Sequence, residues 1–359
     1  MTTLKGLALV LTAAAVGLAA AGGATGKTST APAKLRHVDG RIEALAIDGN
    51  RIAYGVEPAS TRNRVVVWNV RHGRTTTVSG AGTARTGDSS TGSGLSGLAI
   101  AGTRVAWLAN VGGNTEGDDY LFASTVTNPK ERKVAAVQRT GEACSGGPPS
   151  VNPGCAGDWL LGLVGSGNVI ALDRWTTAPP PGTASASLDT LGTTLQPIAS
   201  DVPPLLPLDV DAGRIAVLRS AQEVALYTSS GKLLYAMAYS TVAGAALSGR
   251  NLVVLTATRK LQVFDARAGS LRKTLSVHGS TRQKPGNLDV RGNIAIYTMG
   301  SSVHAVNLSS GNDRVIGTLP HGVGLARISS AGVAYATGRF RSRGTLVFVP
   351  LARVAAAVS

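Results

Sequence analysis

A pattern of strand, tight turn and strand recurs along the chain and constrains the possible folds more than any other feature of the sequence. The first apolar residues after the recurring turns are Ile52, Val105, Val169, Ile215, Leu252, Ile294 and Val333. Successive copies lie 53, 64, 46, 37, 42 and 39 residues apart. A period of about 40 residues with four short strands per copy is typical of β-propeller blades. The sequence therefore predicts an all-β fold, a seven-bladed β-propeller of four-stranded antiparallel blades.

The outer hairpins of the copies also share a pattern. The segments that begin at Val65, Val224, Leu261 and Val303 read VVVWNVRHGRTTTV, VALYTSSGKLLYAM, LQVFDARAGSLRKTLSV and VHAVNLSSGNDRVIG. Only 15% of the residues are charged, and 45 are glycines. This composition is typical of a β-rich protein with many turns, and it excludes a disordered chain.

The turns of the forms D-x-x-x-G and S-S-G-K/N resemble those of WD40-like and pyrroloquinoline-quinone-type propeller repeats, over most of residues 42–350. Trp68-Asn69 and Phe264-Asp265 stand where WD40 blades carry Trp-Asp, and Leu271–Leu275 lacks the closing Trp of the quinone family. The resemblance implies a propeller fold and assigns no functional residue. A quinone is not supported, and we expect no cofactor.

The last copy of the repeat lacks an outer strand, because residues 351–359 read as an alanine-rich tail. The segment Lys34–Val38 has no other partner. We expect it to supply the fourth strand of the last blade and to close the ring, which would remove the exposed edges of that blade. The predicted organisation is a signal peptide or anchor (1–26), an N-terminal segment with the closing strand (27–41), the propeller (42–350) and a C-terminal tail (351–359).

The N-terminal residues have the pattern of an export signal. Lys5 precedes an apolar run, Leu7–Ala21, which ends in the small residues that a signal peptidase accepts. The run is shorter than the ~20 residues of a stable membrane span, which favours cleavage, although a retained anchor is the alternative. We expect an exported protein that is extracellular or associated with the cell envelope, in contact with the membrane only if this segment is retained.

The two cysteines, Cys144 and Cys155, are separated by ten residues of Gly, Pro, Ser, Val and Asn. A disulfide is the natural state of such a pair in an exported protein. Two thiols without a nearby histidine make half a zinc site at best, and a redox role would favour C-x-x-C spacing. The sequence predicts a structural disulfide that closes this loop.

The chain is strongly basic, with 35 Lys+Arg against 20 Asp+Glu and a net charge of +15. One interpretation is a polyanionic partner such as nucleic acid, an anionic membrane or a phosphate-rich cell wall. The other is a compositional bias with arginines scattered over turns. The longest basic stretch is Lys130–Lys133, and no nucleic-acid-binding motif is present, so a polyanion partner would require the fold to gather these charges on one face.

The extra length of the longer copies lies in four connections, 80–94, 109–119, 140–157 and 176–186. In a four-stranded antiparallel blade, the turns after the first and third strands lie on one rim and the remaining connections lie on the other. All four long connections are expected on the second rim. Long loops on a rigid scaffold commonly carry binding sites, so we expect any ligand there.

The candidate ligand-binding residues on this rim are charged or aromatic. They are Glu116, Asp118, Asp119, Tyr120, Arg174, Trp175, Arg339, Arg341 and Arg343. The acidic group could bind Ca²⁺, but its spacing favours a solvated turn, and no metal site is predicted. The arginines could bind a phosphate or carboxylate or form an exposed hairpin tip, and Trp175 is expected to be a packing anchor.

No catalytic motif is evident. The histidines, which are dispersed along the chain, are His37, His72, His278, His304 and His321. A G-x-S-x-G nucleophile motif is absent from the sequence. Asp48, Asp209 and Asp289 fall near the innermost strands, where propeller glycosidases place carboxylates, but aspartate beside glycine is also common in turns.

Two functions therefore remain open. The favoured one is an exported, non-catalytic propeller that binds a protein, peptide or glycan through the long connections of one rim. The alternative is an extracellular hydrolase or lyase with carboxylates in the central funnel. A cluster of two or more carboxylates in the central channel would favour the enzyme.

Overall fold

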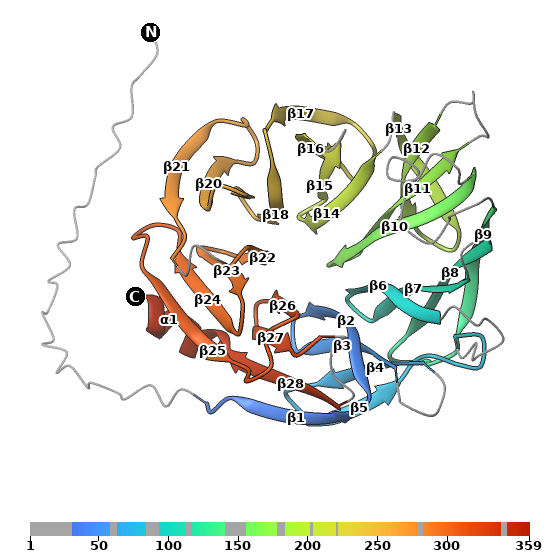
Figure 1. The fold of residues 1–359 in the computed structure, drawn as a ribbon, viewed down its shortest axis with the longest axis horizontal. Helices are drawn as coiled ribbons and strands as arrows, with labels where there is room; N and C mark the ends of the chain where they lie inside the picture. The colour runs from blue at the N-terminus through green and yellow to red at the C-terminus, as the bar shows by residue number, and fades with distance from the viewer. Residues whose placement is uncertain are drawn as a thin grey trace, which may run out of the picture. The chain divides into compact units, whose positions relative to one another are not determined.

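The computed structural model describes residues 31–57, 63–83, 93–112, 116–140, 156–177, 184–201, 204–219, 222–278, 283–338 and 343–359. All of them belong to one structural unit, Ala31–Ser359. The export segment, both cysteines, Arg339 and Arg341 lie outside the described residues. The regular structure is almost entirely β-strand (Figure 1), which confirms the predicted all-β class.

Four of the sheets are antiparallel meanders whose strand order follows the chain. The first consists of β2 (Arg41–Asp48), β3 (Arg51–Glu57), β4 (Arg64–Asn69) and β5 (Arg74–Thr77). The second consists of β14 (Leu205–Asp211), β15 (Arg214–Arg219), β16 (Glu223–Thr228) and β17 (Leu233–Ala238). The third consists of β18 (Val242–Ser248), β19 (Asn251–Thr256), β20 (Lys260–Asp265) and β21 (Leu271–Ser276). The fourth consists of β22 (Pro285–Arg291), β23 (Ile294–Met299), β24 (Ser302–Asn307) and β25 (Asp313–Thr318).

Two further copies of the repeat are fused into one eight-stranded sheet. The first half consists of β6 (Ser93–Ala101), β7 (Arg104–Gly112), β8 (Glu116–Thr125) and β9 (Arg132–Thr140). The second half consists of β10 (Ala156–Ser166), β11 (Val169–Thr177), β12 (Ala184–Leu191) and β13 (Leu195–Asp201). The halves join where the end of β9 pairs with the start of β10, with Thr140 opposite Ala156 and Arg139 opposite Gly157.

The last sheet combines both ends of the described chain. It consists of β26 (Leu325–Ile328), β27 (Gly332–Ala336), β28 (Arg343–Pro350) and β1 (Lys34–Asp39). β1 pairs with β28 along its whole length, from Lys34 opposite Phe348 to Asp39 opposite Arg343. The predicted pairing of residues 34–38 with the last copy is therefore confirmed.

The sheets have a propeller-like arrangement around a common centre (Figure 1). The innermost strand of each copy contacts that of the next, in the order β2, β6, β10, β14, β18, β22 and β26, and β26 contacts β2. Turns after the first and third strands of each copy lie on one rim, here called the turn rim. The remaining connections lie on the opposite, connection rim.

Side chains in the innermost turns join neighbouring copies on the turn rim. The amide of Gly102 donates to Oδ2 of Asp48 (2.6 Å), and the amide of Gly249 donates to Oδ2 of Asp211 (2.6 Å). Gly102 and Gly249 have φ of 62° and 54°, in the left-handed region that glycine adopts without a Cβ clash. The hydroxyl of Ser329 donates to the carbonyl of Gly49 (2.8 Å), which links the last copy to the first.

Residues 351–359, expected to be a tail, form a short helix, α1 (Leu351–Val358). The helix buries Val354 and Val358 in the apolar cluster between the last two copies. Alanine has the highest helix propensity, so the alanine-rich composition suits this element. Within the described part of the chain, no helix has the length and apolar character needed to span a membrane.

Candidate functional site

The two copies in the eight-stranded sheet have longer strands than the others. β8 and β10 contain 10 and 11 residues, whereas β20 and β24 contain 6 each. Much of 109–119 and 176–186, expected as loops, is therefore strand: Asn110 pairs with Asp119, and Trp175 pairs with Ala186. We call the connection-rim ends of β7 to β12 the strand extension.

Asp119 is the best-connected of the predicted residues in the strand extension. Its Oδ1 lies 2.8 Å from Nη1 of Arg139, and its Oδ2 accepts a hydrogen bond from the amide of Leu160 (3.3 Å). Burial raises the pKa of Asp119 above its usual value, although Arg139 opposes this effect. The Arg139 guanidinium also lies 4.3 Å from the ring centroid of Trp159, so it is held between a carboxylate and an indole.

Trp159 also connects this group to Trp175. The two residues face each other across the β10–β11 pair and form a small apolar cluster in which both rings are buried. A buried ring packs rather than stacks on a ligand, which agrees with the role expected for Trp175. The neighbouring Arg174 is partly exposed, and its Nε lies 3.5 Å from Oδ2 of the buried Asp189.

Buried polar atoms that lack a hydrogen-bond partner concentrate in the strand extension. In the described part of the chain, nine buried side-chain nitrogen or oxygen atoms have no such partner, and seven of them lie on β9 to β12, five in or next to the strand extension and two nearer the turn rim. They belong to Arg139, Trp159, Asp173, Trp175 and Asp189. Arg139 retains its ion pair with Asp119. Because buried polar groups normally find partners, this concentration indicates a place where water or a ligand supplies them.

Asp173 and Asp189 are fully buried carboxyl groups that affect each other electrostatically. Oδ2 of Asp173 accepts a hydrogen bond from the amide of Leu205 (3.1 Å) at the start of the next sheet. Burial, with a smaller contribution from the charge of Asp189, raises the pKa of Asp173 to about 7, although the hydrogen bond from Leu205 opposes this shift. Burial also raises the pKa of Asp189, whereas a hydrogen bond with Ser187 and the charge of Arg174 act to lower it. Near neutral pH, Asp173 can therefore either donate or accept a proton.

Of the other predicted site residues, Glu116, Asp118 and Tyr120 also lie on the connection-rim end of β8, whereas Arg343 lies apart. Glu116 is exposed at the start of β8, and the hydroxyl of Tyr120 donates to Oδ2 of Asp118 (2.9 Å). Arg343 begins β28 in a different sheet, where it lines a surface hollow with His37. Among the residues that the structure describes, no three His, Cys, Asp or Glu side chains are grouped as metal ligands.

A second candidate lies in a cavity between the innermost strands of several copies. Asp209, Asp289 and Arg327 come from the innermost strands β14, β22 and β26, and they line a cavity of about 100 Å³. Asp209 and Asp289 both stand in the sequence Leu-Asp-Val. Two carboxylates that were named as possible channel residues are therefore brought to one cavity, whereas Asp48 instead binds a turn of the next copy.

Both central carboxylates already bind backbone amides. Asp209 accepts hydrogen bonds from Val210 (2.7 Å) and Leu247 (2.6 Å). Asp289 does the same with Val290 (2.7 Å) and Ile328 (2.8 Å). Leu247 and Ile328 belong to the innermost strand of the next copy, so each carboxylate joins two copies.

The charge state of this pair follows from its position. Although partly accessible from the cavity, both groups lie deep in the protein, and burial raises the pKa of each. The charge of Asp289 raises the pKa of Asp209 further, while Arg327 opposes the shift of both. The arrangement can hold a proton between like charges, but each oxygen also has a structural hydrogen bond.

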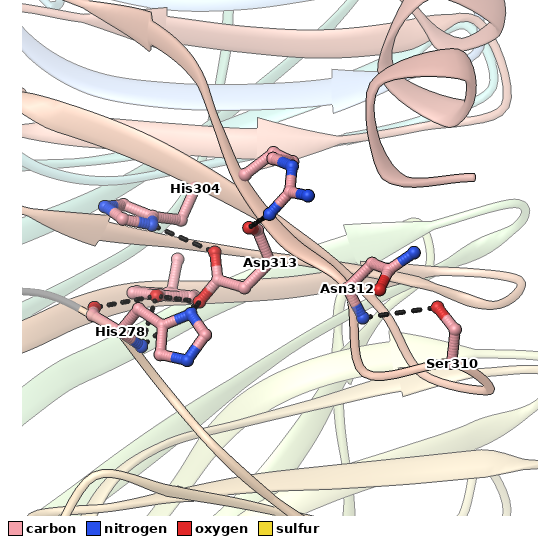
Figure 2. Close-up of polar contacts among 7 residues, drawn as sticks. His278, His304, Ser310, Asn312 and Asp313 are labelled. Atoms are coloured by element: carbon pink, nitrogen blue, oxygen red, sulfur yellow. Dashed lines mark hydrogen bonds and ion pairs between the residues drawn. The ribbon is translucent and has the colours of Figure 1, made fainter.

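A third polar cluster surrounds Asp313, the first residue of β25 (Figure 2). Its carboxylate accepts hydrogen bonds from the Tyr297 hydroxyl (2.5 Å), His304 Nδ1 (3.0 Å) and the His278 amide (3.1 Å). Burial alone would raise the pKa of Asp313, but these hydrogen bonds lower it below its usual value. The exposed His278 ring lies 3.6 Å from the same carboxylate, an arrangement that superficially resembles a catalytic dyad.

The same arrangement recurs in the second copy without any histidine. Glu131, just before β9, accepts hydrogen bonds from the amides of Gly80 (2.7 Å) and Gly82 (2.8 Å) and from the hydroxyl of Thr83. Trp107 donates to that hydroxyl (2.8 Å) and stacks on Phe122 at 5.9 Å.

The two clusters occupy corresponding places in their copies, although Tyr297 donates directly to Asp313 and Trp107 reaches Glu131 through the Thr83 hydroxyl. Tyr297 pairs and stacks with His304 at 4.7 Å, as Trp107 does with Phe122. The acidic residue in each fastens the preceding inter-sheet connection to the outer strand. The Asp313 cluster is therefore a structural feature of the repeat.

Sequence reasoning missed Arg139, Trp159, Asp173 and Asp189, the residues that complete the strand extension. Asp173 directly precedes Arg174 in the sequence Asp-Arg-Trp, and Trp159 follows Asp158. Charged residues beside tryptophan on predicted strands were the available signal. Their meeting depends on the pairing of β10 with β9 and β11, which no local pattern encodes.

No protein-family model matches the sequence, and no curated protein matches it. Among solved structures, the chain is similar to the computationally designed Ika8 protein, with a TM-score of 0.49 and 12% sequence identity. The alignment covers 87% of this chain and 97% of that one. A likeness of this degree assigns no function to the chain.

Proposed function

We propose that the chain forms a closed seven-bladed β-propeller with WD40-like repeats, in which β1 completes the last blade. Each half of the eight-stranded sheet counts as one blade in this assignment. Support comes from the contacts between β26 and β2, from the Ser329–Gly49 hydrogen bond and from the apolar cluster shared by the first and last sheets. The propeller is exported by its N-terminal segment, and Cys144 and Cys155 form a disulfide on the connection rim.

We further propose that the protein is a non-catalytic binding module whose strand extension binds a protein, peptide or glycan. The observation that carries this proposal is the concentration of unpartnered buried polar atoms there. These atoms include the N–H donors of Trp159 and Trp175 and Oδ1 of Asp173. A few convergent polar groups in an apolar setting are typical of ligand sites, and the mixture of donors and acceptors suits amide or hydroxyl groups.

The alternative function is a hydrolase or lyase that uses Asp209 and Asp289. The convergence of these carboxylates on one cavity favours this alternative. Two observations weigh against it. The four carboxylate oxygens all accept backbone hydrogen bonds, two of which join copies, and a cavity of about 100 Å³ is small beside the ~300 Å³ or more of ordinary ligand sites.

The test is a thermal-shift screen of residues 27–359, which include the whole unit Ala31–Ser359, against soluble glycans and peptides. A ligand that binds the folded state raises the melting temperature by mass action. For any ligand found, Arg174→Ala removes a partly exposed side chain of the strand extension. Arg64→Ala removes an exposed arginine near the same rim of another copy and serves as the matched control.

We expect Arg174→Ala to weaken binding by about tenfold, because a hydrogen bond from a charged group contributes roughly 1.5–3 kcal/mol, and Arg64→Ala to leave it unchanged. If Arg174→Ala left binding unchanged but Asp209→Asn abolished it, the ligand-binding site would be the central cavity and not the strand extension. Cleavage of a glycan that requires Asp209 and Asp289 would establish the enzymatic alternative.

A further inference from the structure

The exposed large apolar side chains of the described residues share one location. They are Leu35, Leu233, Leu234, Leu271 and Val315, and each is between 37% and 59% exposed. All five lie within the first three residues of an outermost strand: β1, β17, β21 or β25. Since outermost strands begin at the turn rim, the five side chains lie at the outer margin of that rim.

Each of these apolar side chains has a basic residue within two positions in the sequence. Lys34 and Arg36 flank Leu35, and Lys232 precedes the two leucines of β17. Arg272 and Lys273 follow Leu271, and Arg314 precedes Val315. We call this set of four strand starts the basic-apolar arc. Figure 1 shows its strands on successive sheets, from β17 through β21 and β25 to β1.

The positive charge of the arc is largely uncompensated. Asp265 pairs with Arg272, and Asp313 is buried in its own hydrogen-bond network. Lys34, Lys273 and Arg314 donate to backbone carbonyls, which leaves their charge intact. Arg267 and Arg353, both exposed, add charge beside β21 and β28.

Exposed apolar groups beside lysine and arginine are characteristic of surfaces that bind anionic lipid, because the apolar groups enter the headgroup region while the cations pair with headgroups. Binding to a soluble polyanion requires only the charge. Protection of open strand edges against self-association also requires only the charge, and exposed leucines would work against it. We infer that the basic-apolar arc is a docking surface for an anionic lipid bilayer.

The course of the chain agrees with this assignment. β1 begins at the turn rim, and the residues that precede Lys34 join the unit there. An apolar N-terminal run retained as an anchor would attach the unit by its basic margin. A mature protein without this run would still present four apolar and basic strand starts to the same surface, so the inference does not depend on retention.

The experiment is co-sedimentation of residues 27–359 with phosphatidylcholine vesicles, with and without phosphatidylglycerol. We expect binding only to the anionic vesicles, with a decrease as salt is raised, because each basic residue near the surface contributes electrostatically within a Debye length. Absence of binding to anionic vesicles at low salt would overturn the proposal.

Two variants separate lipid docking from charge alone. Leu233→Ser/Leu234→Ser keeps every charge, and we expect it to weaken vesicle binding by about tenfold because less apolar area enters the interface. Arg74→Glu/Lys130→Glu reverses exposed charges near the starts of β5 and β9 on the same rim, outside the arc. It serves as the charge control, and we expect it to reduce binding less than Lys232→Glu/Lys273→Glu does.

Unchanged vesicle binding by the leucine variant, or equal loss in the two charge variants, would overturn the arc as a lipid surface and leave a diffuse charge effect. Tighter binding to soluble dextran sulfate than to vesicles would assign the charge to a polyanion instead. The substituted side chains are exposed, apart from Lys273, which is partly exposed, and matched melting temperatures confirm that each variant is folded.

Discussion

Aspartate side chains join neighbouring copies both in the region from β14 to β25 and in the eight-stranded sheet, but they stand on innermost strands in the first region and on the second strand of a copy in the other. Asp209 in β14 and Asp289 in β22 each accept a backbone hydrogen bond at both carboxyl oxygens. One of the two donor amides belongs to the next copy. In β11, Asp173 also accepts an amide from the next copy, but its second oxygen has no partner. In the copies from β14 to β25, which we call the regular copies, both oxygens of these aspartates have hydrogen-bond partners. In the eight-stranded sheet, whose copies we call the extended copies, Asp173 has a partner for only one oxygen.

This difference follows from unequal strand length. The amide that Asp173 binds belongs to Leu205, the first residue of β14. β11 continues past this point with Arg174 and Trp175, where the neighbouring innermost strand has already ended. Polar groups that extend beyond the neighbouring sheet lose the backbone partners that the repeat normally provides. A length mismatch between neighbours therefore creates capacity for binding without any new motif.

The largest expected effect concerns the regular part of the ring. Deleting residues 31–40 removes β1 and its six residue pairs with β28, and at roughly 0.5–1.5 kcal/mol per hydrogen bond the loss should be several kcal/mol. We expect a sharp fall in melting temperature, measured by calorimetry. Deleting only residues 31–33 serves as the control, because they precede β1.

An unchanged melting temperature after the longer deletion would show that β1 does not hold the ring together. The last sheet would then be stable with an open edge at β28. If the first and last sheets instead lost their protection from hydrogen exchange while the eight-stranded sheet kept it, the contrast between the two regions would be strengthened.

The repeat, its strands and the partner of β1 could be predicted from the sequence, because turns with glycine and alternating apolar residues encode them locally. The fusion of two copies could not. The segment 109–119 contains glycine, asparagine and acidic residues typical of a loop, yet Asn110 and Asp119 are paired strand residues. Their pairing depends on tertiary neighbours, which override weak local β-propensity. For the same reason, Asp173 could not be recognised as buried.

A smaller, pH-dependent effect on stability tests Asp173, the carboxyl group with one unpartnered oxygen in the eight-stranded sheet. The pKa of Asp173 is raised from 3.8 to about 7, so the folded state keeps its proton while the unfolded chain ionises. Stability from this group is complete below pH 4 and is lost as pH rises towards 7, by up to about 1.4 kcal/mol per pH unit. We expect Asp173→Asn to raise the free energy of unfolding at pH 8 by a few kcal/mol and to have little effect at pH 4.

The control is Asp265→Asn in the regular part, where the sign is reversed. Hydrogen bonds from the amides of Arg267 and Ala268 lower the pKa of Asp265, so its contribution is present at pH 8 and lost in acid. We expect this variant to be less stable than the parent at pH 8. Urea titrations at both pH values give the four free energies. Destabilisation by Asp173→Asn at pH 8 would mean that Asp173 is a satisfied carboxylate, and the contrast between the two regions would fail.

The smallest expected effect concerns the Asp313 cluster, which has a counterpart around Glu131 in the extended part. His278 binds Asp313 through its backbone amide, which His278→Ala keeps, and its exposed ring lies 3.6 Å away. We expect this variant to lose no more than about 0.5 kcal/mol, as for exposed ion pairs. His304→Ala removes a buried hydrogen bond and a stacked ring and should cost about 1–3 kcal/mol. Urea unfolding at pH 7 measures both changes.

His304→Phe separates the two contributions of that ring, because Phe122 fills the equivalent place beside Trp107. Phenylalanine can keep the stacking on Tyr297 but cannot donate to Asp313, so its stability should lie between those of the parent and His304→Ala. A larger loss from His278→Ala than from His304→Ala would reverse this order. The exposed histidine would then contribute most of the stability of the cluster. The Asp313 cluster would no longer be equivalent to the Glu131 cluster, and its structural role would not follow.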